Sequence, residues 1–428
     1  MLARSVHDIG QARETREAPL GLREGLELIS QAQVVLNARF VNRVEVIRGL
    51  MYALLTGHHG LLLGRTGTAK SLLVNQILDA LGGSGSRVFT IKASIDDTKD
   101  NYFGPIDVLA YRERGLKTRH LENSLLEADY AFIDEIFDTN EQVLRDLMLI
   151  LSDGVLQEGP VSYTAPLRTV FAACNYLRVN EVTEALLDRF LFKMVVPQDV
   201  DPFAQLQIDM NVNARDFDVP LPFVDQAFIE RVVSIAQGRS DEQEIHIPTR
   251  ILFLKSIILS SYQARMRKKT PDFFISPRRQ ARMLELMRLG ALLAGRTEVD
   301  ESDLTALRYM AGTINGEQRE VETFERTLEE TLRYFAIDPK LSFATEIVSL
   351  AYDMARAPVL DPANWARLEM ALASAPDRDR KRGRLPKMGW DGLYRIIDDL
   401  DVSFAPLDDL RRGCLELITG KSSQIRAV

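Results

Sequence analysis

Residues 64–71 have the residue types that bind a phosphate chain. They read Gly-Arg-Thr-Gly-Thr-Ala-Lys-Ser and lie between an apolar run and an amphipathic stretch typical of a helix. Glycines allow a tight turn that points several backbone N–H groups at one place, where the positive end of the following helix dipole adds to the attraction. Lys70 would neutralise the β- and γ-phosphates, and the hydroxyl of Ser71 would be a ligand of Mg²⁺.

This loop departs from the P-loop pattern Gly-x4-Gly-Lys-Ser/Thr at one position, because Ala69 replaces the second glycine. Alanine is compatible with a right-handed backbone, so we predict that the loop is intact though less free. A chance glycine-rich turn is the alternative, and the Lys-Ser pair in register between strand and helix argues against it. The residues predicted to hold the nucleotide are Gly64, Arg65, Thr66, Gly67, Thr68, Ala69, Lys70, Ser71 and Leu72.

Two adjacent carboxylates, Asp134 and Glu135, follow the apolar run at 130–133. At the carboxyl edge of a parallel sheet, where ligands bind in open α/β folds, Asp134 would hold Mg²⁺ through water. Glu135 would polarise an attacking water, which is the work of a general base. An acidic helix cap is the alternative, and the P-loop 64 residues upstream of Asp134 favours the catalytic interpretation.

Three further polar residues are candidates for the same site. Asn175 ends another apolar run and would orient the water and sense the γ-phosphate, unless it lies in an ordinary turn. Arg189 precedes the last apolar run, where it would reach a phosphate on an adjoining subunit or merely pair with Asp188. Arg278 lies in the first turn of a predicted helix and opposes its dipole, so either nucleotide contact or plain solvation explains it.

The apolar pattern predicts the elements that would position these side chains. Runs bounded on both sides indicate strands of a parallel sheet covered on two faces, at 60–63, 88–91, 130–133, 169–174 and 191–196. Helical periodicity dominates after residue 197. We therefore predict four parts: a helical lead-in at 1–40, an α/β core at 41–200, a helical domain with its connector at 201–312, and a helical extension at 313–428.

The composition is that of a soluble globular protein. Of 428 residues 46% are apolar and 27% charged, which excludes a disordered chain, and the net charge of −8 gives no general attraction to nucleic acid. Two cysteines, Cys174 and Cys414, cannot make a disulfide framework and favour a reducing compartment. No apolar run reaches the roughly 18–20 residues of a membrane span, and the polar start is unlike a secretory signal, so we expect a cytoplasmic protein.

In this order the motifs resemble those of the AAA+ ATPases, and more closely those of the MoxR family. The RavA-like group is the best match, because it too has Ala before the Lys-Ser. The resemblance covers about residues 40–312 and fades in the tail. It implies that Walker A is 64–71, Walker B is Asp134 and Glu135, sensor 1 is Asn175, the arginine finger is Arg189, and sensor 2 is Arg278, with Arg279 as the alternative.

The resemblance also implies an architecture and an activity. The fold would be an α/β P-loop NTPase core with a five-stranded parallel sheet, an all-helical lid and a helical C-terminal extension. Residues 101–105 look like the Phe-Gly-Pro signature, 107–120 like the helix-2 insert, and 155–166 like the hairpin before sensor 1. Relatives form rings, typically hexamers, in which Mg²⁺ and ATP bridge core, lid and the next subunit's finger. They remodel a client protein, usually with a von Willebrand factor A domain partner.

Three rival functions stay open at this point. A nucleic-acid motor predicts basic pore inserts, yet residues 157–165 contain no Lys or Arg, and the basic cluster at 377–384 is more typical of a solvated loop. A switch or scaffold that binds nucleotide but hydrolyses little of it does not need Glu135, Asn175 and Arg189, and all three are present. A GTPase would have an Asn-Lys-x-Asp motif, which we do not find.

Overall fold

A computed structural model shows two compact units. The structure describes residues 5–9, 20–81, 86–177, 181–198, 201–214, 217, 220–312, 318–376 and 386–426, so the basic cluster at 377–384 lies outside it. The sheet unit comprises Met1–Ile245, Ile275–Thr297 and Ala306–Val321. The helical unit comprises His246–Phe274, Glu298–Thr305 and Glu322–Val428.

The sheet has six strands in the order β1-β3-β4-β7-β2-β8. Their bounds are Ser5–Ile9 for β1, Gly60–Leu63 for β2, Ser86–Lys92 for β3, Tyr130–Asp134 for β4, Thr169–Cys174 for β7 and Phe192–Val195 for β8. The five neighbouring strands β3, β4, β7, β2 and β8 are parallel, which confirms the predicted core. Their short apolar runs are buried on both faces, as parallel strands require.

The sixth strand is a finding that the sequence did not predict. β1 pairs antiparallel with the edge strand β3, from Ser5 opposite Thr90 to Ile9 opposite Ser86. Among the described residues of the predicted helical lead-in at 1–40, this strand precedes the helix α1, which spans Leu22–Arg39. The pattern did not predict this strand because pairing with an edge strand needs only backbone hydrogen bonds. A polar segment without apolar periodicity can also make those bonds.

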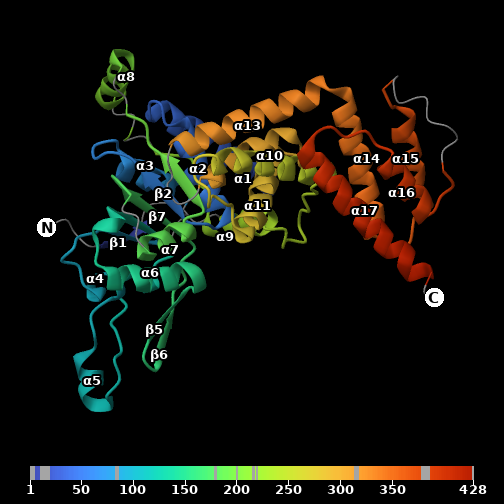
Figure 1. Cartoon of the computed structure of the whole chain (residues 1–428). Helices are drawn as coiled ribbons and strands as arrows, with labels where there is room; N and C mark the ends of the chain where they lie inside the picture. Colours follow the sequence, from blue (N-terminus) through green and yellow to red (C-terminus); the bar gives the residue numbers. More distant parts are fainter. Residues whose placement is uncertain are drawn as a thin grey trace. The chain divides into compact units, whose positions relative to one another are not determined.

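Helices cover both faces of the sheet (Figure 1). The helices of the sheet unit are α1, α2 (Val44–Thr56), α3 (Lys70–Leu81), α4 (Lys99–Phe103), α5 (Val108–Arg114), α6 (Glu141–Asp153), α7 (Glu181–Arg189), α8 (Pro202–Asn213), α9 (Gln226–Ala236), α11 (Pro277–Leu293) and α12 (Arg308–Ala311). On one face α4, α6 and α7 share a core with the strands, built around Phe89, Ile133, Leu147 and Phe190. Polar caps fix where helices begin, for example Asn140, whose Oδ1 accepts from the N–H of Val143 at 3.0 Å.

The helical unit packs around its own apolar core. Its helices are α10 (Thr249–Arg267), most of α13 (Gln318–Ile337), α14 (Pro339–Arg356), α15 (Pro362–Ala373), α16 (Trp390–Asp398) and α17 (Ala405–Arg426). Trp365, Ile347 and Ile397 lie in the buried cluster. The predicted domain at 201–312 is thus divided, since α11 belongs to the sheet unit and α10 to the helical unit. Long-range packing, which a local pattern does not report, decides this division.

No helix within the described ranges is long and apolar enough to cross a lipid bilayer.

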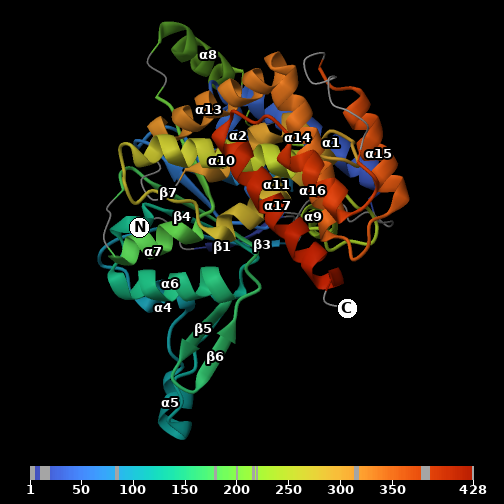
Figure 2. The same cartoon turned by 45° about the vertical axis from the view of Figure 1, so that its right-hand side comes forward.

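Two inserts leave the sheet unit together (Figures 1 and 2). One carries α5, and the other is the hairpin of β5 (Val155–Glu158) and β6 (Val161–Thr164), which was predicted. The buried guanidinium of Arg119 joins them, because its Nε and Nη2 donate to the Glu158 carboxylate at 2.6 and 2.8 Å. Its Nη1 also donates to Asp100 at 2.7 Å. Arg119 therefore anchors the base of the α5 insert to the turn end of the hairpin.

Gly104, in the Phe-Gly-Pro segment, provides a test of that base. Its φ is +83°, and a Cβ there would lie 1.8 Å from the carbonyl oxygen of His120. We expect Gly104→Ala to lower the free energy of unfolding by more than the roughly 1–2 kcal/mol that a left-handed alanine costs. Gly115→Ala is the matched control, since its φ is +66° with open space around a Cβ. Urea unfolding measures both, and equal losses would contradict the role of the close approach.

Candidate nucleotide-binding site

The glycine-rich loop connects the carboxyl end of β2 to the first turn of α3. β2 ends at Leu63 and α3 begins at Lys70, so the loop lies at the edge of the sheet where the predicted carboxylates also lie. Gly67 has a φ of +85°, which a side chain would disfavour. The hydroxyl of Thr68 donates to the carbonyl of Arg65 at 2.8 Å and closes the turn. The local geometry is that of a P-loop.

Ala69 differs from our expectation. Its φ is +60°, in the left-handed region, so the prediction of a right-handed backbone was wrong. The reason is that the carbonyl of Ala69 accepts the α3 backbone bond from Leu73 at 2.9 Å, while the loop before it must still turn sharply. A left-handed alanine costs roughly 1–2 kcal/mol, so the missing glycine leaves strain in the loop.

A second strained residue lies at the same edge. Glu135 has a φ of +54° directly after β4. Among the described residues, the other two non-glycine positions with positive φ are Asn42 and Asn123, and asparagine tolerates that conformation. The strained residues that are not asparagine therefore both belong to the predicted phosphate and water-activating motifs, which is where functional strain concentrates.

Lys70 and Asn175 join the loop to the neighbouring strand. The Nζ of Lys70 donates to the carbonyls of Gly64 at 2.5 Å and Arg65 at 3.1 Å, and to Asn175 Oδ1 at 3.0 Å. Lys70 is buried, and within the described part of the chain all these partners are uncharged oxygens. A buried ammonium without a carboxylate partner favours an anion nearby.

The two predicted carboxylates have separate partners. Asp134 Oδ2 accepts from the hydroxyl of Ser71 at 3.2 Å. Glu135 Oε1 accepts from Asn175 Nδ2 at 2.5 Å, and the same Nδ2 lies 2.8 Å from Thr66 Oγ1. The structure therefore brings together Lys70, Ser71, Asp134, Glu135 and Asn175, all of which the sequence predicted.

The oxygen donors here suit Mg²⁺ that arrives with phosphates. Ser71 Oγ and one carboxylate are the hard ligands that Mg²⁺ takes alongside substrate oxygens. In the described ranges no group of three or more His, Cys, Asp or Glu could hold a metal ion. Ser71 and Asp134 thus offer part of a coordination shell that phosphate oxygens and water could complete.

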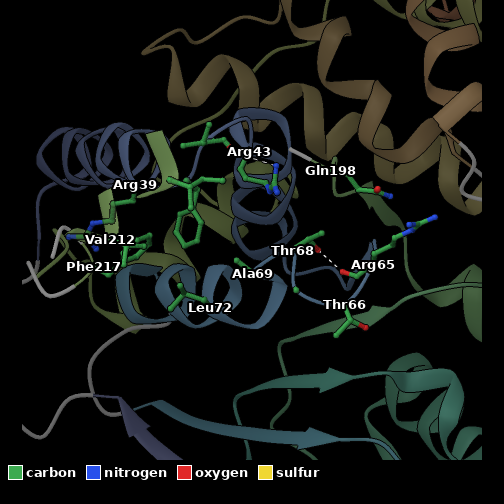
Figure 3. Close-up of a pocket in the computed structure, with 14 residues that line it drawn as sticks. Arg39, Arg43, Arg65, Thr66, Thr68, Ala69, Leu72, Gln198, Val212 and Phe217 are labelled. Carbon is green, nitrogen blue, oxygen red and sulfur yellow. Dashed lines mark hydrogen bonds between the residues drawn. The ribbon is translucent and has the colours of Figure 1, made fainter. Parts of the chain in front are cut away.

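A cavity of about 410 Å³ opens beside the loop (Figure 3). The loop residues that line it are Arg65, Thr66, Gly67, Thr68, Ala69 and Leu72. The other lining residues, which the sequence did not predict, are Arg39, Phe40, Val41, Arg43, Gln198, Ile208, Val212 and Phe217. They come from the α1–α2 turn, from α8 and from the segments flanking α8, so no local motif marks them. The volume and the apolar side chains suit a nucleoside next to the phosphate loop.

The predicted arginines lie at the opposite, amino edge of the sheet. Arg189 ends α7 just before β8, and its Nε donates to Ser152 on α6. Phe190 contacts the ring of His59, the residue before β2, with centroids 6.4 Å apart. Burial lowers the pKa of His59 to about 4, and the charge of Arg278 contributes to this shift. Arg278 therefore lies near this edge too, next to Arg279, whose guanidinium is 3.6 Å from Asp188 of α7. Four residues of β-strand, about 13 Å, separate the edges.

Arg279 has a structural environment that Arg278 lacks. Its buried guanidinium donates to the carbonyl of Gly312 and lies 3.6 Å from Asp188. Arg278 is exposed on the first turn of α11. Of the two candidates for sensor 2, Arg278 is the one whose side chain can reach a ligand.

Comparisons with known proteins agree with this geometry. A family model described as the MoxR domain in the MoxR-vWA-beta-propeller ternary systems matches residues 27–210, and an AAA lid domain model matches 255–324. Two uncharacterized proteins of Methanocaldococcus jannaschii are 26% and 25% identical, over 64% and 66% of this chain and 67% and 71% of theirs. A structural protein of Acidianus two-tailed virus is 29% identical over 38% of this chain and 26% of its own.

A crystal structure from Cytophaga hutchinsonii, described as a "putative ATPase", shares the fold. It has a TM-score of 0.56 at 16% identity and covers 73% of this chain and 95% of its own. The parallel sheet, the P-loop and the helical lid define an AAA+ protein. Within that class, the chain belongs to the MoxR family of AAA+ ATPases. Its placement in a RavA-like group stays a prediction.

The strain at Ala69 leads to a stability prediction. Ala69→Gly removes a Cβ from a left-handed position, so we expect the free energy of unfolding to rise by up to about 1 kcal/mol, net of glycine's greater freedom when unfolded. Ala32→Gly, in the middle of α1 at ordinary helical φ, is the control and should lose about 1 kcal/mol. Chemical unfolding decides, and a loss in both variants would argue against strain at Ala69.

Proposed function

We propose that this protein hydrolyses ATP with Mg²⁺ in a homo-oligomeric ring, typically a hexamer, and uses the cycle to remodel a client protein. The observation that carries the proposal is the division of the polar residues between two edges. Lys70, Glu135 and Asn175 meet at the P-loop edge, while Arg189 and Arg278 lie at the other. A complete site therefore requires two copies of the chain, joined head to tail as rings are.

The proposed chemistry begins at the Glu135 carboxylate. Asn175 donates to one of its oxygens and so orients it, and Glu135 is nearly buried, which keeps it from free rotation in solvent. In that position it would take the proton of the attacking water as the general base. Lys70 would bind the β- and γ-phosphates, and Ser71 and Asp134 would hold Mg²⁺. When bound, Mg²⁺ supplies neutralisation of the phosphate oxygens.

Asn175 would also report which nucleotide is bound. It hydrogen-bonds to Lys70, Thr66 and Glu135 at once, so a γ-phosphate that competes for Lys70 must change this network. Such a local change can bias a larger movement of the chain, as in other nucleotide switches. This supports the role of sensor 1.

We propose that both arginines act on the neighbouring copy. The sequence suggested that Arg278 would act from the lid beside Arg189 of the next subunit, and its position near His59 supports contact across the interface instead. An arginine supplied in trans has been worth roughly 10³–10⁵ in rate in other nucleotide hydrolases. Hydrolysis should therefore depend on assembly.

The partner and location belong to the same proposal. A von Willebrand factor A domain protein is the proposed partner, and the support is the description of the matched MoxR model. We propose a cytoplasmic location, which is supported by two free and buried cysteines, Cys174 and Cys414.

A nucleic-acid motor is the weaker alternative. Its pore inserts should present basic side chains throughout. The α5 insert exposes Arg112 and Lys117 beside the acidic Glu113, whereas Arg119 is buried in contacts to Glu158 and Asp100. The hairpin residues at 157–165 contain no Lys or Arg. A scaffold with little hydrolysis would not need the oriented Glu135.

Glu135→Gln tests the general base. The amide preserves shape but does not accept a proton, so we expect ATP affinity within about threefold of wild type and turnover at least 10²-fold slower. Calorimetry measures the first and phosphate release the second. Glu127→Gln, at a half-buried carboxylate that pairs with Arg87 before the amino end of β4, is the control. Unchanged turnover in Glu135→Gln would remove the proposed role.

Mixing experiments test the shared site. Arg189→Ala alone should lose activity, and so should Glu135→Gln alone. A mixed ring pairs the intact P-loop edge of the first variant with the intact arginine of the second, so phosphate release should partly return. Absence of rescue at every mixing ratio, with both variants assembled by sedimentation, would contradict a site between copies.

A further inference from the structure

Helix α8 has two apolar faces. Ile208 and Val212 line the cavity beside the P-loop. Asn211, on the same side, donates to the carbonyls of Ala38 and Arg39 at 3.0 Å, and Ala204 is buried. These contacts fix which side of α8 faces the sheet unit.

The other side of α8 carries an apolar stripe in solvent. Phe203, Leu206 and Met210 are spaced three and four residues apart, so they share one face of the helix. Their exposed fractions are 67%, 54% and 62%. In Figures 1 and 2, α8 stands away from the sheet. Large apolar side chains gathered on one exposed face mark an interaction site.

The position of α8 indicates what would cover this stripe. α8 flanks the P-loop edge, and the proposed function requires a second copy to bring Arg189 to that edge. We call the amino edge of the sheet, where Arg189 and Arg278 lie, the arginine edge. It has an exposed apolar side chain of its own, Leu149 on α6, which lies one helical turn before Ser152, the residue that accepts from Arg189. Asp209 is the single charged residue of α8, so the helix offers no cation to nucleic acid or lipid headgroups.

We propose that the outer stripe of α8, consisting of Phe203, Leu206 and Met210, packs against the arginine edge of a second copy of this chain. The inference rests on the proposed function, and it adds a surface that no nucleotide contacts. Because the inner face of α8 lines the nucleotide cavity, the helix would link an occupied site to the contact between copies.

The first experiment separates binding from assembly. The variant combines Phe203→Glu and Met210→Glu, and the control combines Val34→Glu and Met370→Glu, which are also exposed on helices. Affinity for a fluorescent ATP analogue should stay within twofold of wild type in both. In sedimentation velocity with a slowly hydrolysed ATP analogue, the concentration for half-assembly should rise at least tenfold in the α8 variant only.

The outcomes distinguish the two proposals. Failure of the wild-type chain to assemble overturns the proposed function and, with it, the α8 interface. A wild type that assembles, together with an α8 variant that assembles equally well, overturns only the α8 interface. An equal loss of assembly in the control also overturns it, because added charge alone would then explain the effect.

A second experiment asks which edge the stripe serves. Mixed with Arg189→Ala, the α8 variant should regain phosphate release, because one interface then has an intact α8 and an intact arginine. Mixed with Lys70→Ala, it should regain none, since both defects lie on the same edge. The reverse pattern would place the stripe at the arginine edge and would overturn the proposal.

A crosslinking experiment tests the contact directly. A photocrosslinker is attached to the thiol of the Met210→Cys variant, and unlabelled chains are mixed with isotope-labelled ones. The crosslinks should join different chains, and crosslinks within one chain only would overturn the proposal.

Discussion

The organisation of the site depends on one side-chain amide. Asn175, at the carboxyl end of β7, accepts from Lys70 and donates to Glu135 and Thr66, so a single residue holds the phosphate loop and the general-base candidate in one network. This is possible because β7 lies between β4 and β2 in the sheet. Parallel strands that are neighbours present their carboxyl ends side by side, although the residues concerned are far apart in the sequence.

The same edge is where the backbone is strained. Ala69 and Glu135 both adopt left-handed conformations, which cost free energy that the packed sheet beneath them must offset. The buried runs of β2, β4 and β7 provide that rigid support. Strain held by a well-packed scaffold keeps the loop and the carboxylate in place before any ligand arrives, which reduces the ordering that binding would otherwise require.

The opposite edge explains why one copy is an incomplete catalyst in our proposal. Arg189 and Arg278 lie about one strand length from the P-loop, and Asp188 lies between Arg189 and the buried Arg279. The contacts of Arg279 with the chain near Gly312 tie this edge to the start of the segment that leads into α13.

The sequence by itself determined the chemistry-bearing motifs and the five parallel strands, because both are local: buried strands are continuous apolar runs, and the P-loop residues are consecutive. The proximity of Asp134 and Asn175 to Lys70 followed from the same strands. Tertiary structure alone decided the left-handed backbone of Ala69, the added strand β1, the cavity residues such as Phe40 and Val212, and the distance of Arg278 from the P-loop. The backbone at Ala69 depends on how the loop turns into α3, which residue types alone do not specify. The other three depend on contacts between segments remote in the chain, and no local periodicity encodes such contacts.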